Sequence, residues 1–326
     1  MRARSIALGA AGAGVLAAVG VTAATAAYLR REYVREDPAA ADAFDVLADL
    51  EHHTIPADDG GELHLVERGN PDGRPLLFVH GVTLSSAIWR YQLRDLASDF
   101  RVLALDQRGH GISKAGADGY GLELLGRDLV TVLDKLDLHR AVVVGHSMGG
   151  FATMQLCVAH PKVVSERVAG IVLTNTAAQV IRSRSAWTVP MARRVLATAG
   201  ALPRPAKPNP AAVYLGSRLT FGQHPSPSQV RFIGDIGAAL PPEIFTPSVI
   251  GFLDMDLRQG LRGVDVPALV VAGSHDRLTP VRAAREIAAN LPGAELVVLP
   301  GAGHTIMLER HAELDRLITD FAAALP

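Results

Sequence analysis

Two hydrophobic patterns alternate along most of the chain. Short, almost continuously apolar runs are typical of parallel strands that are buried on both faces of a sheet. They lie at residues 75–80, 101–105, 141–144, 168–173, 268–272 and 295–299. Between them, apolar residues recur at helical spacing over residues 86–97, 122–136, 148–160, 280–291 and 309–323. This alternation predicts an α/β fold with a mostly parallel central sheet and helices on both faces.

Two segments depart from this rhythm. Residues 53–57 and 62–68 flank an Asp-Asp-Gly-Gly sequence, which is typical of a hairpin turn between antiparallel strands. Residues 176–263 lack a strand–helix–strand unit and are rich in proline and aromatic side chains, which indicates an inserted helical cap, or lid. We therefore expect a core domain made of residues 52–175 and 264–326, interrupted by this cap.

The first 37 residues have a different character. Residues 5–29 form an uncharged run with arginines on both sides, and about 20 such residues suffice to span a bilayer. We expect residues 1–37 to anchor the protein in a membrane through an N-terminal helix. The alternative is secretion after signal cleavage, since Ala24-Thr25-Ala26 fits a cleavage site. Residues 38–51 are expected to form a linker.

Composition excludes several classes of protein. With 326 residues, 48% of them hydrophobic and 20% charged, the chain is not a disordered one. A formal net charge of −1 does not favour a nucleic-acid partner. The sequence contains neither an HExxH motif nor paired CxxC motifs, and no phosphate-binding glycine motif follows a strand, so we expect no metal and no cofactor. The single cysteine, Cys157, excludes an internal disulfide and is expected to be buried.

The beginning of the expected cap has an uneven charge. Between residues 176 and 210 the chain has six basic residues and no acidic one. The more common explanation of such a stretch is an ordinary solvated face, and the alternative is contact with anionic lipid or with an acidic group of a substrate. The sequence leaves these alternatives open.

One serine stands at an abrupt end of a predicted strand. Ser147 lies between Gly145 and Gly149, and a helical pattern begins at Met148. A serine in this place can simply cap the helix. The spacing Gly-x-Ser-x-Gly also matches a nucleophile elbow, in which the glycines permit a sharp turn from strand to helix and leave the hydroxyl exposed.

A serine nucleophile needs a base, and a neutral histidine base needs an acid that orients it. His304 follows the last apolar run, and Asp276 follows the run before it. Because the carboxyl ends of parallel strands meet at one edge of a sheet, we expect both side chains at the same edge as Ser147. The chain order Ser147, Asp276, His304 is one of the known orders of the catalytic triad.

From about residue 52 onwards the chain resembles the α/β-hydrolase fold superfamily, and in particular serine esterases and lipases with a helical cap. Five motifs occur in the matching order, and each follows a predicted strand. They are His80-Gly81-Val82, Asp106-Gln107-Arg108-Gly109-His110-Gly111, Gly145-His146-Ser147-Met148-Gly149-Gly150, Gly273-Ser274-His275-Asp276 and Gly303-His304. The resemblance implies an oxyanion hole made of the backbone N–H groups of Val82 and Met148.

The function that this resemblance implies is hydrolysis of carboxylic esters through an acyl-enzyme on Ser147. The apolar cap favours a lipophilic small-molecule ester. Other acyl or C–C hydrolysis and cofactor-free perhydrolysis, as in haloperoxidase-like proteins, use the same triad, and a non-catalytic binding protein is a third alternative. Epoxide hydrolases and haloalkane dehalogenases look similar but use an aspartate as the nucleophile, where this chain has serine.

Overall fold

The computed structural model describes residues 37, 39–40, 49–180, 188–200 and 209–326. The chain divides into two units, which are described separately: Met1–Ala43 with Ser226–Gln229, and Phe44–Pro225 with Val230–Pro326. In the small unit, the carboxylate of Asp37 accepts hydrogen bonds from the hydroxyl of Ser226 and from the backbone N–H and hydroxyl of Ser228. The large unit holds the sheet and the candidate site.

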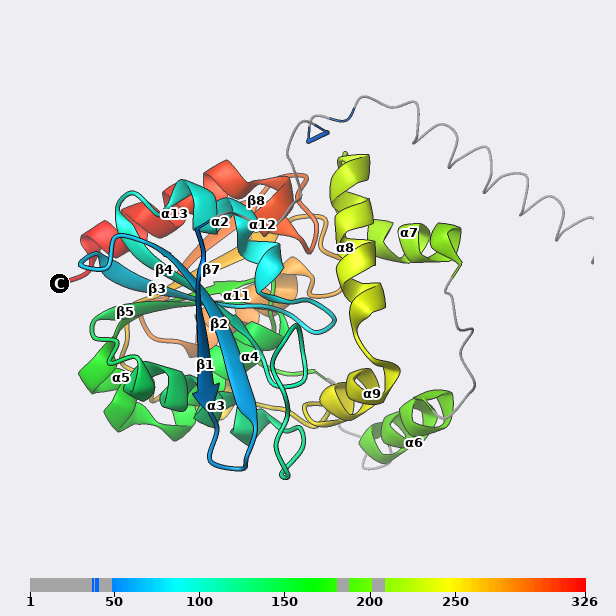
Figure 1. The fold of residues 1–326 in the computed structure, drawn as a ribbon, viewed down its shortest axis with the longest axis horizontal. Helices are drawn as coiled ribbons and strands as arrows, with labels where there is room; N and C mark the ends of the chain where they lie inside the picture. The colour runs from blue at the N-terminus through cyan, green and yellow to red at the C-terminus, as the bar shows by residue number, and fades with distance from the viewer. Residues whose placement is uncertain (1–36, 38, 41–48, 181–187, 201–208) are drawn as a thin grey trace, which may run out of the picture. The chain divides into compact units, whose positions relative to one another are not determined.

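An eight-stranded sheet forms the centre of the large unit, with the strand order β1-β2-β4-β3-β5-β6-β7-β8 (Figure 1). β1 (Glu51–Pro56) pairs antiparallel with β2 (Glu62–Gly69), and β2 pairs antiparallel with β4 (Phe100–Asp106). All other pairs are parallel, and the remaining strands are β3 (Arg74–Val79), β5 (Ala141–His146), β6 (Val168–Thr174), β7 (Ala268–Gly273) and β8 (Glu295–Leu299). The predicted α/β class with a mostly parallel sheet is confirmed.

Helices cover both faces of this sheet (Figure 1). One face carries η1 (Ser86–Trp89), α2 (Arg90–Asp95), α12 (Ile306–Glu309) and α13 (His311–Ala324). The other face carries α3 (Leu122–Lys135), α4 (Met148–Ala159), α10 (Arg258–Leu261) and α11 (Val281–Asn290). A short helix that the sequence pattern did not indicate, α5 (Pro161–Arg167), connects α4 to β6.

Burial on both faces explains why the strands are continuously apolar. In β5, Val143 belongs to the core cluster that packs against α3, α4 and α11, whereas its neighbours Val142 and Val144 point to the opposite face. All three side chains are fully buried. Both sets of alternating positions are therefore in contact with a helical layer, and neither tolerates a polar residue.

Cys157 lies on α4 within the same core cluster. Its side chain is 3% exposed, and burial raises the pKa of its thiol to about 12. The thiol therefore stays protonated at neutral pH, and the expectation of a buried, inert cysteine is confirmed.

The described residues between β6 and β7 form mainly helices. They are α6 (Thr188–Gly200), α7 (Pro210–Arg218), α8 (Pro227–Ala239), α9 (Pro242–Ile250) and α10. The inserted helical segment that was expected from the missing strand pattern is thus present. Phe221 and Tyr214 are among its buried aromatic side chains.

The expectation of a membrane-anchored protein is wrong. In the part of the chain that the structure describes, no helix is both long and apolar enough to cross a bilayer. Residues 1–36, on which the expected anchor and the alternative of a cleaved signal both rested, lie outside the described residues. Their uncharged run consists largely of alanine and glycine, which drive insertion far less than leucine or isoleucine does.

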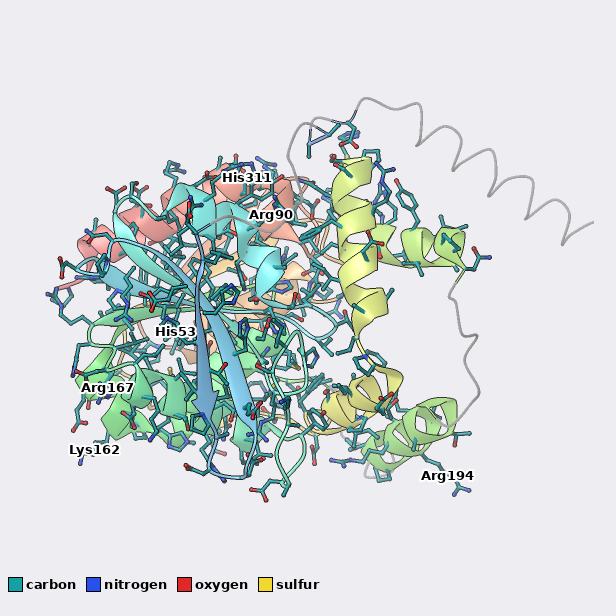
Figure 2. All side chains as sticks on the ribbon, viewed as in Figure 1. His53, Arg90, Lys162, Arg167, Arg194 and His311 are labelled. Carbon is teal, nitrogen blue, oxygen red and sulfur yellow. The ribbon has the colours of Figure 1, made fainter. Side chains whose placement is uncertain are left out.

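A buried polar pair joins α2 to α13. Gln92 Nε2 donates a hydrogen bond of 2.7 Å to Asp315 Oδ1. His311, labelled in Figure 2, lies at the start of α13, and its ring stacks on that of Tyr91 with centroids 4.0 Å apart. Asp315 Oδ2 and Gln92 Oε1 are both buried acceptors that have no hydrogen-bond partner among the residues described. Burial raises the pKa of the Asp315 carboxyl to about 7. A proton on Oδ2 would change this buried, unpaired acceptor into a hydrogen-bond donor.

We expect Asp315 to make stability depend on pH. Its folded pKa of about 7 lies above the unfolded value of about 3.9, so its contribution is complete below pH 4 and is lost as the pH rises through 7. The variant Asp315→Asn offers the same donor and acceptor at every pH, and its unfolding free energy should change less between pH 5 and pH 8. Urea titrations across this range measure the difference.

The control is Asp320→Asn, which removes an exposed carboxylate from the same helix. This variant should keep the wild-type slope of stability against pH. Equal slopes for wild type and Asp315→Asn would contradict the assignment of a protonated Asp315.

Candidate active site

Ser147 occupies a strained turn between β5 and α4. Its backbone angles are φ 51° and ψ −115°, a region that side chains other than glycine rarely adopt. A Cβ atom on Gly149 would overlap the carbonyl group of Val79, and one on Gly145 would overlap the carbonyl of Gly149 and the hydroxyl of Thr153. The two glycines are therefore required because the helix starts so close to neighbouring strands.

The turn does not use the serine side chain as a helix cap. Ser147 is the N-cap residue of α4 by position, but its side chain makes no capping hydrogen bond. The backbone is fixed instead: Ser147 N–H donates to the carbonyl of Thr174 at 3.2 Å, and Thr176 Oγ1 donates to the carbonyl of Ser147 at 2.8 Å. The hydroxyl is left at the wall of a cavity.

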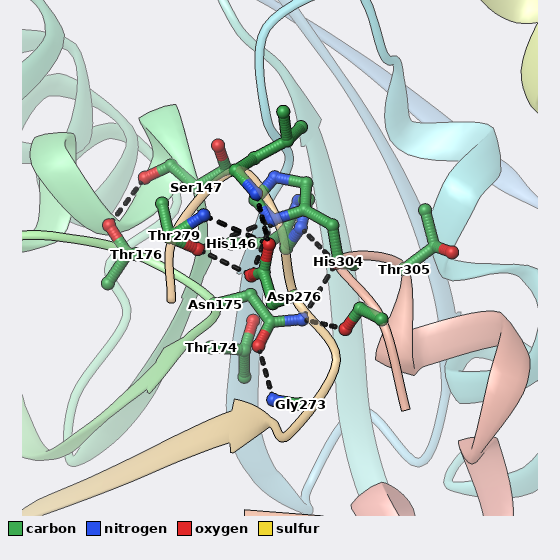
Figure 3. A network of polar contacts seen from close by, with 12 residues as sticks. His146, Ser147, Thr174, Asn175, Thr176, Gly273, Asp276, Thr279, His304 and Thr305 are labelled. Atoms are coloured by element: carbon green, nitrogen blue, oxygen red, sulfur yellow. Dashed lines mark hydrogen bonds and ion pairs between the residues drawn. The ribbon is translucent and has the colours of Figure 1, made fainter. Parts of the chain in front are cut away.

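Asp276 and His304 are in direct contact at the carboxyl edge of the sheet (Figure 3). His304 Nδ1 lies 2.8 Å from Asp276 Oδ2, and both residues are buried. The same carboxylate accepts hydrogen bonds from the backbone N–H groups of Leu278 and Thr279 and from the hydroxyl of Thr279. Because an ionised carboxylate only accepts, the network assigns the proton to Nδ1 and leaves Nε2 of the neutral ring as an acceptor.

Thr279 lies just before α11, which begins at Val281 with Pro280 as its N-cap residue. The hydroxyl of Thr279 donates to Asp276 Oδ2 at 2.6 Å. The threonine therefore helps to fix the carboxylate that faces His304.

The backbone of His304 is held by three segments that are distant in sequence (Figure 3). Its carbonyl accepts hydrogen bonds from Asn175 Nδ2 at 2.8 Å and from His146 Nε2 at 2.9 Å. Its N–H donates to the carbonyl of Thr220 at 2.6 Å. Asn175 also accepts from the N–H of Gly273 at 2.7 Å, so one amide ties the loop of His304 to the end of β7.

Glu309 fixes the same loop from the other side. Its carboxylate accepts hydrogen bonds from the N–H of Gly222 at 2.7 Å, from the N–H of Gly303 at 3.0 Å and from the hydroxyl of Thr305 at 3.1 Å. Burial raises the pKa of this carboxyl. The sequence patterns indicated neither Glu309 nor Asn175, because no motif marks a residue whose function is to hold the backbone of a distant loop.

The other histidines at strand ends are neutral and bound to the backbone. Burial lowers the pKa of His80 to about 4, and burial together with the neighbouring His304 ring holds the pKa of His146 well below its usual range. His80 Nδ1 donates to the carbonyl of Gly81, and His80 Nε2 accepts from the N–H of Gln107. Neither ring competes with His304 for the part of a base.

The motif at residues 106–111 has a structural role, because its side chains bind the backbone and side chains of neighbouring loops. The carboxylate of Asp106 accepts hydrogen bonds from the N–H groups of Ser86 and Ile112 and from the ring of His64. The guanidinium of Arg108 is buried between Asp128 and Asp59, with contacts of 2.7 and 2.9 Å. These ion pairs raise the pKa of Arg108 against the effect of burial.

Val82 and Met148, the expected oxyanion-hole residues, line the same cavity as Ser147. Met148 is the first residue of α4, so its N–H has no acceptor within the helix. The cavity measures ≈ 210 Å³. Most of its remaining lining is apolar and comes from Phe151, Ala177, Val180, Phe252, Leu278, Pro280 and Ala283.

The structure thus places Ser147, Asp276 and His304 at one edge of the sheet, but it does not show a hydrogen bond between Ser147 and His304. Asp276 and His304 are hydrogen-bonded, and the ring of His304 lies 4.7 Å from that of His146, the residue before Ser147. Among the described residues, none forms a hydrogen bond with the Ser147 hydroxyl. Catalytic hydrogen bonds are often long without a substrate and shorten when one binds.

Comparison with known proteins places this geometry in a family. A family model described as the alpha/beta hydrolase fold matches residues 74–311, which include Ser147, Asp276 and His304. The chain belongs to the alpha/beta hydrolase fold family. It is accordingly treated below as a hydrolase.

Three similar proteins illustrate the range of this family. A protein named as carbamate hydrolase RutD from Variovorax paradoxus is 31% identical over 272 residues, which cover 80% of this chain and 96% of that protein. The solved structure of an enol-lactonase from Burkholderia xenovorans is 27% identical with a TM-score of 0.70, and the match covers 84% of this chain and 100% of the other. Esterase EaEST from Exiguobacterium antarcticum is 22% identical with a TM-score of 0.74, covers the same shares and shows the common fold.

The strained turn predicts that glycine at position 147 stabilises the fold. In Ser147→Gly the positive φ carries no steric cost, whereas Ser147→Ala keeps that cost and loses a hydroxyl without a capping bond. We expect Ser147→Gly to be more stable than Ser147→Ala by about 1 kcal/mol. Urea unfolding of both variants measures the difference. If Ser147→Gly is less stable than Ser147→Ala, the backbone of this turn is not strained.

Proposed function

We propose that the protein is a serine hydrolase that cleaves carboxylic esters through an acyl-enzyme on Ser147. The observation that carries this proposal is the strained turn of Ser147, at the wall of a cavity, together with a hydrogen-bonded Asp276–His304 pair at the same edge of the sheet. If Ser147 served only as the N-cap of α4, it would need neither Asp276 nor His304 beside it. Aspartate nucleophiles, as in epoxide hydrolases, are disfavoured because a serine occupies the turn.

The proposed reaction uses the unprotonated Nε2 of His304. It takes the proton of the Ser147 hydroxyl while Oγ attacks the ester carbonyl. The N–H groups of Val82 and Met148 stabilise the oxyanion, and removal of one such donor in other enzymes costs about 3–4 kcal/mol. His304 then protonates the leaving alcohol, and a water molecule repeats these steps on the acyl-enzyme. Asp276 keeps the proton on Nδ1 and stabilises the charged ring.

A lipophilic acyl group is the proposed substrate class. The support is the apolar lining of the cavity, where Phe151 and Phe252 have ring centroids 5.2 Å apart. The enol-lactonase is named for the hydrolysis of a cyclic ester, in agreement with ester cleavage. Carbamate hydrolysis is the second candidate, because the relative that is 31% identical is named as a carbamate hydrolase.

We also propose that residues 176–263 act as the cap of a core made of residues 52–175 and 264–326. Two contacts support this division. The carbonyl of Thr220 binds the N–H of His304, and Phe252 lines the cavity of Ser147. The cap therefore contributes to the site both through its backbone and through an apolar side chain.

A fluorophosphonate probe should label the protein at Ser147. Such probes react with serines that a neighbouring base activates, so Ser147→Ala should lose all labelling. The control is Ser165→Ala, which removes an exposed hydroxyl on α5 and should be labelled like the wild type. Equal labelling of wild type and Ser147→Ala would contradict the proposed nucleophile.

Hydrolysis of a chain-length series of p-nitrophenyl esters tests the reaction itself. We expect turnover by the wild type, and a loss of about 10⁴-fold in kcat for Asp276→Asn, since the amide favours the wrong tautomer of His304. A p-nitrophenyl carbamate tests the second candidate in the same assay. Faster turnover of the carbamate than of every ester would replace the ester assignment.

A further inference from the structure

One charged side chain lines the cavity of Ser147. Arg282 on α11 contributes to its wall together with the neutral Gln179 and Thr279. Among the described residues, no carboxylate lines this cavity. The lining of the cavity therefore combines mostly apolar side chains with one positive charge, the guanidinium of Arg282.

Arg282 has no ion pair with any residue that the structure describes, and its side chain is exposed. Glu286, one turn further along α11, forms its ion pair with Arg258 instead, with a contact of 3.3 Å. The charge of Arg282 is therefore not neutralised within this part of the protein. A guanidinium in this state binds a carboxylate through two parallel hydrogen bonds.

The charge pattern of the cap agrees with this position. Gln179 and Val180, which line the cavity, belong to the stretch between residues 176 and 210 that has six basic residues and no acidic one. No opposing negative charge is thus available from this stretch of sequence. Among the residues that line the cavity, an anionic group therefore meets one positive charge and no negative one.

The geometry points to an anion subsite at Arg282, and we propose that the substrates are esters whose acyl chain ends in a carboxylate. This inference rests on the proposed serine hydrolase activity. The acyl chain stays on Ser147 after the alcohol has left, so it has to occupy the cavity that Ser147 and Arg282 share. Apolar side chains such as Phe151 and Val180 contact its methylene groups, and Arg282 binds its far end.

Two matched esters test the subsite. One is p-nitrophenyl hydrogen adipate, and the other is p-nitrophenyl 6-methylheptanoate, in which an isopropyl group replaces the carboxylate. The readout is the ratio of kcat/KM for the anionic ester to kcat/KM for the neutral one. We expect Arg282→Gln to lower this ratio about tenfold through KM, as the loss of a charged hydrogen bond predicts. Arg282→Lys keeps the positive charge and should retain part of the preference for the anionic ester.

The matched control is Arg285→Gln, an exposed arginine on the same helix that does not line the cavity. It should keep the wild-type ratio, and added salt should lower the ratio of the wild type. If both esters are hydrolysed with a ratio that Arg282→Gln leaves unchanged, the anion subsite is overturned and the serine hydrolase stands. If neither ester is hydrolysed and the fluorophosphonate probe labels nothing, both proposals are overturned.

Discussion

The carbonyl oxygen of His304 is the point on which the geometry of the site depends. It accepts hydrogen bonds from His146, at the end of β5, and from Asn175, directly after β6. A buried carbonyl that loses its partners costs about 1–3 kcal/mol, so the loop cannot move away from these strands at low cost. Since β5 also leads into Ser147, the same two strands position the proposed nucleophile and the proposed base.

Steric contact imposes the second constraint. Helix α4 begins so close to β3 that only glycine fits at position 149, where a Cβ would meet the carbonyl of Val79. Val79 lies three residues before Val82, and Met148 opens the helix on the other side of this contact. The close packing therefore brings together the two backbone segments whose N–H groups are the proposed oxyanion hole. Ser147 adopts its positive φ at the same close contact and lines the cavity there.

Sequence patterns were informative where a local rule applies and failed where contacts are distant. The strands could be predicted because burial on both faces demands continuous apolar runs, and the edge shared by Ser147, Asp276 and His304 followed from the parallel sheet. The roles of Asn175 and Glu309 could not be predicted, since each holds a backbone group that is distant in sequence, 129 residues away for Asn175 and 87 for Glu309. Residues 1–37 suggested a membrane anchor by length and lack of charge alone, and that expectation proved wrong.

The cap meets the loop of His304 through backbone groups rather than through side chains. The N–H of His304 donates to Thr220, and the N–H groups of Gly222 and Gly303 share the carboxylate of Glu309. Gly222 and Gly303 approach so closely that a Cβ on either would overlap the backbone of the other segment. Contacts of this kind do not depend on the apolar or charged side chains that the cap presents to the cavity. The lining can therefore change, and with it the substrate, while the frame that holds His304 stays the same.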